Sequence, residues 1–134
     1  MDVKSIEQAV NKQFGEMVQL RRHLHMYPEL SFQEVQTPAY IADYLRSLNI
    51  DVREGVGGRG VVGRLIVDES LPTVALRADF DALPIQDLKD TPYKSTVPGV
   101  MHACGHDAHT AIVLTAAKIL SGMKDELKGN IVFI

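Results

Sequence analysis

The stretch GVVGRLIVDESLPTVALRA, residues 60–78, decides the fold class of this chain. Its two ends, 60–67 and 73–78, are runs of β-branched and other apolar residues, and such runs predict strands. The segment 68–72 between them ends in proline and predicts either a hairpin turn or another short connection. We therefore expect a sheet in the middle of the chain.

Two further segments extend the expected sheet. Upstream, Ile50 and Val52 predict a short strand, and the glycine-rich segment 55–60 after it predicts a flexible turn. Downstream, GNIVFI, residues 129–134, opens another strand. Because the chain stops inside that run, we expect it to be part of a longer protein.

Helical periodicity precedes these strands. An apolar residue recurs every three or four positions from Ile6 to Leu24, while Ser5 with Gln8 predicts a capping box and Pro28 predicts the end of the helix. This segment is expected to be the first and longest amphipathic helix.

Two more helices are expected. One starts at a second capping box, Ser31 with Glu34, and ends near Asn49. Another follows Asp107, as its N-cap, and ends at Gly122. Helices that alternate with strands predict an α/β domain with a largely covered sheet.

The composition is that of one globular domain. In 134 residues, 46% are hydrophobic, and 14 basic against 17 acidic residues give a net charge of −3. Neither sign dominates, so no nucleic-acid or membrane-surface partner is expected. The single cysteine allows no internal disulfide, and no run reaches the length of a membrane-spanning helix. We therefore expect a cytoplasmic protein.

The stretch MHACGHDAHT, residues 101–110, concentrates side chains that bind transition metals. Cys104 and His106 stand two apart, and Gly105 between them admits unusual backbone angles that let thiolate and imidazole converge. This donor pair favours Zn²⁺ over harder divalent ions. A catalytic metal needs further ligands, which His102 or His109 could supply.

Carboxylates that could complete such a site lie in RADFDALP, residues 77–84. Asp79 and Asp81 follow an expected strand and would face the same way if the strand continued. They could ligate a metal, accept the other ring N–H of a ligand histidine, or serve only as turn and capping residues. A hydrolase with a cysteine nucleophile activated by histidine also stays open at this point. Nucleotide binding has no support, because no phosphate-binding glycine motif is present.

Three segments together resemble a known family. RRHLHMYPELSFQE, LRADFDALPIQD and MHACGHDAHTAIVL occur in this order at 21–34, 76–87 and 101–114. They resemble the N-terminal part of the M20 metallopeptidase family, in its amidohydrolase branch. That branch includes hippurate hydrolases, N-acetyl-diaminopimelate deacetylases and hydrolases of indole-acetyl-amino-acid conjugates.

The resemblance implies the N-terminal portion of a metallopeptidase-like catalytic domain, an α/β fold with a mixed, mostly parallel sheet flanked by helices. It implies hydrolysis of the amide bond of N-acyl or N-acetyl amino acids at a centre of two divalent ions (Zn, Mn, Co or Ni). Cys104 and His106 match its metal ligands, and Asp81 matches an aspartate that steadies the metal centre. Asp79, His102, Asp107 and His109 take no role from the resemblance.

The family also has parts that follow the segment matched here. These are a glutamate that acts as general base, further ligands, and a lid domain that often mediates dimerisation. We therefore expect residues 1–134 to be a partial catalytic domain, inactive alone, within a protein that forms homo-oligomers. Two alternatives are a dipeptidase or aminopeptidase of the same family, and a non-catalytic metal-binding or interaction module.

Overall fold

The computed structural model describes residues 2–134. Their elements are, in chain order, α1 (Val3–Met26), α2 (Gln36–Ser47), β1 (Asp51–Val56), β2 (Gly60–Leu65), β3 (Thr73–Leu76), α3 (His106–Gly122), a short 3-10 helix (Lys124–Glu126) and β4 (Asn130–Phe133). The expected α/β class is confirmed, and each expected strand and helix has a counterpart.

The four strands form one mixed sheet in the order β1-β2-β4-β3. The tight glycine turn after β1 makes the β1–β2 pair antiparallel; β2 and β4 are also antiparallel, whereas β3 and β4 are parallel. The expected mixed sheet is therefore confirmed, but the expectation that it is mostly parallel is wrong for the described strands. Because β4 lies between β2 and β3, the segment between those two strands is a connection and not a hairpin.

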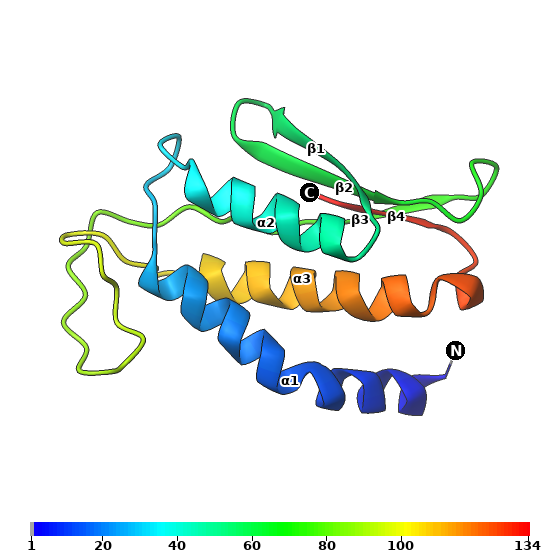
Figure 1. Cartoon of the computed structure of the whole chain (residues 1–134), viewed down its shortest axis with the longest axis horizontal. Coiled ribbons are helices and arrows are strands. Elements are labelled where there is room, and N and C mark those ends of the chain that lie inside the picture. The colour runs from blue at the N-terminus through cyan, green and yellow to red at the C-terminus, as the bar shows by residue number, and fades with distance from the viewer. Residues whose placement is uncertain (1) are drawn as a thin grey trace.

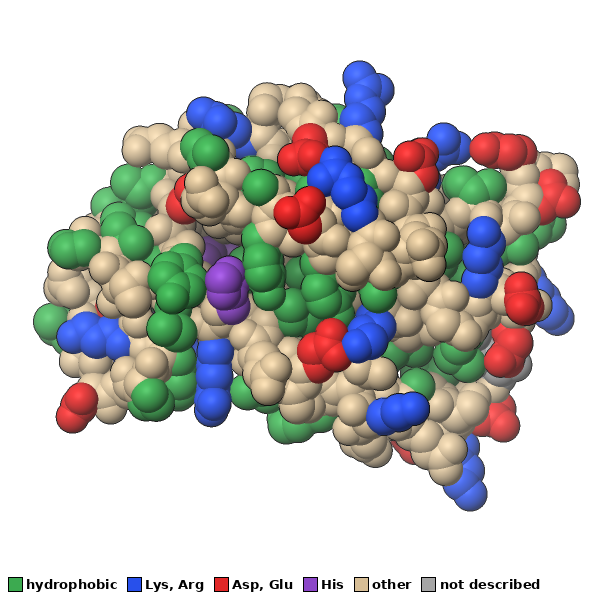
Figure 2. All heavy atoms as spheres, viewed as in Figure 1, with side chains coloured by type: hydrophobic (Ala, Val, Ile, Leu, Met, Phe, Trp, Pro, Cys, Tyr) green, Lys and Arg blue, Asp and Glu red, His purple; other side chains and the backbone are tan. Residues whose placement is uncertain are grey.

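The helices pack in layers on one face of the sheet. In Figure 1, α3 lies between the sheet and α1, and α2 contacts β1, β2 and α3. Alternation along β2 explains which face is covered, because Val61 and Leu65 are buried whereas Arg64 is exposed. Leu45, Leu114 and these two β2 residues belong to the same buried hydrophobic cluster. On the face shown in Figure 2, acidic and basic side chains are interspersed.

Helix α1 begins earlier than the sequence pattern indicates. The capping box is formed by Asp2 and Ser5: the Ser5 backbone N–H donates to Asp2 Oδ1 at 2.7 Å, and the Asp2 backbone N–H donates to Ser5 Oγ at 3.2 Å. The box expected for Ser5 and Gln8 is therefore wrong by one helical turn. No helix in residues 2–134 has the length and apolar character to cross a membrane.

Helix α2 is capped by a residue outside the local pattern. The expected box of Ser31 and Glu34 is absent, and the helix starts at Gln36. Instead, the Glu29 carboxylate accepts hydrogen bonds from the backbone N–H groups of 35–37 at 2.7–3.0 Å. Glu29 thus satisfies three donors that the first turn of a helix leaves unpaired.

Candidate metal centre

A closed loop brings the two candidate site segments together. Leu83 and Met101 exchange two backbone hydrogen bonds, at 3.0 and 3.1 Å, and so close the excursion 84–100 at its base. The segment that ends at Asp81 therefore lies beside the segment that begins α3. Residues far apart in sequence meet here because the loop ends meet.

His106 and Asp81 form the central contact of the site. The His106 Nδ1 lies 2.8 Å from Asp81 Oδ1 and 3.1 Å from the Asp81 backbone oxygen. An Nδ1–H that donates to these oxygens leaves Nε2 as the nitrogen with a free lone pair. A carboxylate that fixes the tautomer and ring orientation of a histidine is the usual second partner of a metal-ligating imidazole. The structure thus shows the contact between Asp81 and His106, while the role in a metal centre that the resemblance implies for Asp81 stays a prediction.

Cys104 and Gly105 lead directly into α3. Gly105 has φ 122°, a conformation that side chains disfavour, and a Cβ at this position would meet no atom within 4 Å. Glycine is therefore favoured at this position by its positive φ angle and not by a lack of room for a side chain, and the unusual backbone angle is the one expected from the sequence. Helix α3 begins at His106, so Asp107 lies in its first turn and the expected N-cap role of Asp107 is wrong. Cys104 is exposed just before the N-terminus of α3.

The neighbouring candidates lie in different surroundings. Asp79 pairs with Arg77 at 2.6 Å on the surface, so it does not share the partner of Asp81. The His109 ring centroid is 5.9 Å from that of His106, and His109 is exposed. His102 is buried with Nδ1 lacking a hydrogen-bond partner, and burial lowers the pKa of His102 to about 4.

A buried polar cluster behind the site was not predicted as functional from the sequence. Asp107 Oδ2 lies 2.6 Å from His25 Nδ1 and 3.0 Å from Arg21 Nε, and both partners are on α1. Asp87, in the loop, lies 3.4 Å from His25 Nε2. The four-residue spacing of Arg21 and His25 places both on one helix face, and this spacing is the one sequence feature that could have indicated that the two side chains act together. The contact between His25 and Asp87 joins residues far apart in the sequence, so no local sequence pattern predicts it.

The described residues fit one part of a metal centre. A thiolate with an oriented imidazole is a donor set suited to Zn²⁺ and similar divalent ions. Within residues 2–134, however, no three His, Cys, Asp or Glu side chains come together as a ligand set. Cys104 and His106 can therefore supply two donors and Asp81 the support, and the remaining ligands of a catalytic site would come from elsewhere.

An open cleft of about 450 Å³ lies next to Asp81. Its lining includes Asp79, the guanidinium-bearing Arg59 and Arg77, and apolar groups such as Phe80. A small molecule with both polar and apolar parts has room here, beside the carboxylate that holds His106.

The chain is similar to known proteins in sequence and in structure. Residues 75–134 match the model of peptidase family M20/M25/M40. The Bacillus subtilis protein YhaA is 59% identical over 138 residues, which cover 100% of this chain and 35% of that protein. The chain is therefore a relative of the M20 peptidases.

Other M20 relatives carry more specific names. An N-acyl-L-amino acid amidohydrolase of Geobacillus stearothermophilus is 42% identical over 134 residues, covering 100% of this chain and 36% of that enzyme. The crystal structure of the YXEP protein of Bacillus subtilis, described as a dinuclear metal-binding peptidase, superposes with a TM-score of 0.83 at 42% identity. That match covers 89% of this chain and 33% of the YXEP chain. The chain thus spans about a third of the length of these relatives.

Proposed function

We propose that this chain is the metal-binding N-terminal portion, residues 1–134, of the catalytic domain of a metal-dependent amidohydrolase. Its reaction is hydrolysis of the amide bond of N-acyl, and in particular N-acetyl, amino acids. The observation that carries the proposal is the His106 ring held by Asp81 at 2.8 Å, two residues after Cys104 in the sequence. The name of the 42% identical N-acyl-L-amino acid amidohydrolase supports the substrate class.

Each site residue has a distinct role in this proposal. Cys104 and His106 hold divalent metal, and Asp81 keeps His106 in the tautomer that presents Nε2. Two divalent ions (Zn, Mn, Co or Ni) held there would supply Lewis-acid chemistry, which polarises an amide carbonyl and lowers the pKa of a water molecule. The cleft next to Asp81 receives the acyl amino acid, whose carboxylate can pair with Arg59 in the cleft lining, since Arg77 already pairs with Asp79.

The proposal includes parts outside these residues. Since residues 2–134 bring no third ligand to Cys104 and His106, the general base and the other ligands come from the remainder of the catalytic domain. We expect the 134-residue chain alone to be inactive, and the full-length protein to carry a lid domain, to form homo-oligomers and to be cytoplasmic.

A second candidate function is hydrolysis of a peptide bond in dipeptides or short peptides. It is favoured by the description of the YXEP protein as a peptidase. The chemistry at the metal would be the same, and only the group next to the scissile amide would differ.

The test is an assay of the full-length protein with N-acetyl amino acids and with dipeptides. Faster turnover of N-acetyl amino acids supports the proposal, and faster turnover of dipeptides supports the second candidate. Cys104→Ser and His106→Ala should each lower kcat/KM by at least about a hundredfold, because each removes a metal ligand. His23→Gln is the matched histidine control, since His23 stacks on Tyr40 at 4.1 Å between ring centroids. Undiminished turnover in both ligand variants would reject the proposal.

A further inference from the structure

His25 lies fully buried where α1, the loop 84–100 and the first turn of α3 meet. One ring nitrogen faces Asp107, with His25 Nδ1 2.6 Å from Asp107 Oδ2. The other faces Asp87, with Nε2 3.4 Å from Asp87 Oδ2. One side chain thus contacts two buried carboxylates from two different segments.

The first carboxylate fixes the start of α3. Asp107 directly follows His106, and its Oδ2 accepts from His25 and from Arg21 Nε at 3.0 Å. Its Oδ1 accepts the backbone N–H of Ala108 at 2.8 Å. Through Asp107, His25 holds the helical turn on which the His106 ring is mounted.

The second carboxylate fixes the loop. Asp87 Oδ1 accepts the backbone N–H and the Nζ of Lys89, each at 3.0 Å, and Oδ2 accepts the backbone N–H of Ser95 at 3.0 Å. The same loop is tied to the end of α1 by Thr96, whose backbone N–H and Oγ1 donate to the Met26 oxygen at 2.8 and 2.7 Å. Asp87 therefore ties two parts of the loop together, and His25 faces the loop at Asp87 and at the Tyr93 ring, whose centroid is 6.2 Å from that of His25.

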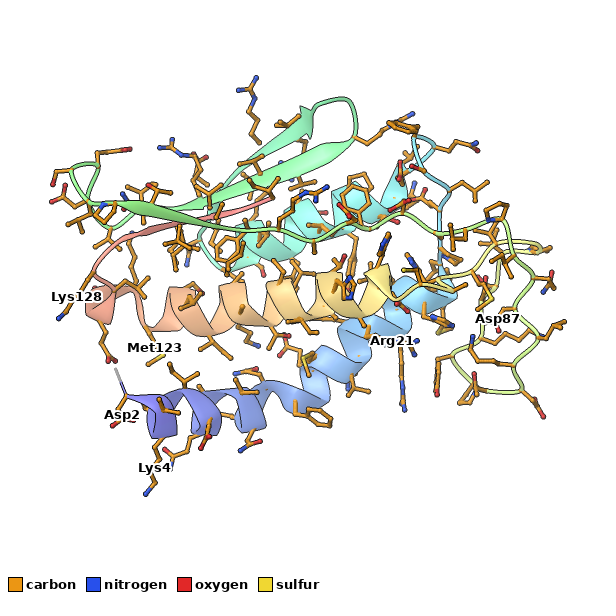
Figure 3. All side chains as sticks on the ribbon, turned by 180° about the vertical axis from the view of Figure 1, so that it is seen from behind. Asp2, Lys4, Arg21, Asp87, Met123 and Lys128 are labelled. Atoms are coloured by element: carbon orange, nitrogen blue, oxygen red, sulfur yellow. The ribbon has the colours of Figure 1, made fainter. Side chains whose placement is uncertain are left out.

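The cluster lies at one end of the molecule. Figure 3 shows the labelled Arg21 and Asp87 toward the same end, and Met123 and Lys128 toward the opposite end. Asn130, which follows Lys128 closely, is another buried polar residue; its side chain binds the backbone of 67–71. The chain thus offers a buried polar control far from His25.

We propose that His25 is a positioning residue for the metal ligands, holding through Asp107 the turn that carries His106 and through Asp87 the loop that brings Asp81 to it. The role of His106 and Asp81 in this statement rests on the proposed function. The two contacts of His25, with Asp107 and with Asp87, are called the clasp here and include none of the proposed metal ligands. The Nε2–Asp87 contact is longer than the Nδ1–Asp107 contact and lacks hydrogen-bond alignment, so the loop is the looser side.

Two substitutions separate the two sides of the clasp. His25→Asn retains a donor near the Nδ1 position and loses the group that faces Asp87. His25→Gln extends a donor toward the Nε2 position and loses the close contact with Asp107. If His25 contributed only to the overall stability of the fold, the two variants would not differ in which segment they loosen.

The experiment is amide hydrogen exchange of the full-length protein, kept metal-free with a chelator. His25→Asn should raise exchange about tenfold in 84–101 and leave 102–109 within about twofold, whereas His25→Gln should raise it about tenfold in 102–109. Asn130→Ala should raise exchange only around 66–72. Wild-type exchange in both segments in both His25 variants, or an equal rise throughout the chain, would overturn the proposal.

Two further measurements keep the test decisive. If the His25 variants do not fold, the isosteric Asp87→Asn variant must still raise exchange in 84–101, and wild-type exchange there overturns the proposal. In the folded variants, Zn²⁺ affinity should fall about 10–100-fold in His25→Gln and stay unchanged in Asn130→Ala. A full-length wild type that binds no Zn²⁺ would reject the proposed function, while the exchange data would still test the clasp.

Discussion

At the scale of single residues, Asp87 shows how a buried carboxylate is kept ionised. Hydrogen bonds from the backbone N–H of Ser95 and from Lys89 lower the pKa of Asp87 well below its ordinary value of 3.8, although burial alone would raise it. A carboxyl whose pKa is lower in the folded state contributes stability above its unfolded pKa. That stability is lost as the pH falls through and below about 4.

The first prediction concerns this carboxylate. Asp87→Asn should lower the free energy of unfolding by about 2–3 kcal/mol at pH 7, because buried donors lose a charged acceptor. The difference from wild type should shrink by about 1 kcal/mol at pH 3, where the unfolded wild type is protonated. Urea unfolding at both pH values measures this, with the exposed Asp43→Asn as control. An unchanged difference at the two pH values would contradict the ionised state of Asp87.

The second prediction concerns the support of His106. Asp81→Asn should lower the Zn²⁺ affinity of the full-length protein about 10–100-fold, because the amide no longer fixes the ring tautomer as a carboxylate does. Asp79→Asn is the matched control, since Asp79 pairs with Arg77. Calorimetric titration with Zn²⁺ compares the two variants, and equal affinities for both would remove Asp81 from the site.

Part of the site follows from the sequence, and the reason is local. The Cys104–His106 spacing and the position of Asp81 shortly after β3 are readable in short segments, and the structure brings His106 and Asp81 into contact. The link from His25 to Asp87 could not be read in this way. It depends on how a loop without periodicity folds back on α1.

At the scale of elements, the helix starts also depend on contacts that local sequence patterns do not predict. The sequence places the helices correctly, but the start of α2 is set by Glu29, which lies several residues before the helix. Hydrogen bonds from 35–37 lower the pKa of Glu29 even though its burial would raise the pKa. A cap supplied from a preceding turn leaves no signature at the helix start itself.

The third prediction tests this cap. Glu29→Ala should lower the free energy of unfolding by about 1–2 kcal/mol, since three N–H groups lose their acceptor. Glu69→Ala, which removes a surface partner of Arg64, should cost less than about 1 kcal/mol. Denaturant unfolding measures the loss in free energy of unfolding for each variant. Equal small losses would show that α2 does not depend on Glu29.

At the scale of the whole molecule, the order of the strands in the sheet could not be predicted from the sequence. The runs 60–67 and 73–78 are adjacent along the chain, yet β4 separates β2 from β3 in the sheet. Long-range pairing of β4 with both strands decides this order, and neither local propensity nor connection length specifies it. The layer of α3 against the sheet then buries the apolar faces that periodicity predicts.

The fourth prediction tests the shared core. Leu114 on α3 is only 2% exposed and belongs to the cluster that joins helices and sheet. Leu114→Ala should therefore lower the free energy of unfolding by about 2–5 kcal/mol. Leu88, which is 87% exposed in the loop, should tolerate Leu88→Ala with a change below about 0.5 kcal/mol. Thermal or urea unfolding measures both, and similar losses would contradict this core.

The central claim is that Cys104 and His106 hold divalent metal, and elemental analysis of the purified full-length protein tests it most directly. Wild type and the His23→Gln control should contain the same amount of divalent metal per chain. Cys104→Ser and His106→Ala should contain clearly less after identical dialysis, because each lacks one donor. Full metal content in both ligand variants would contradict the account.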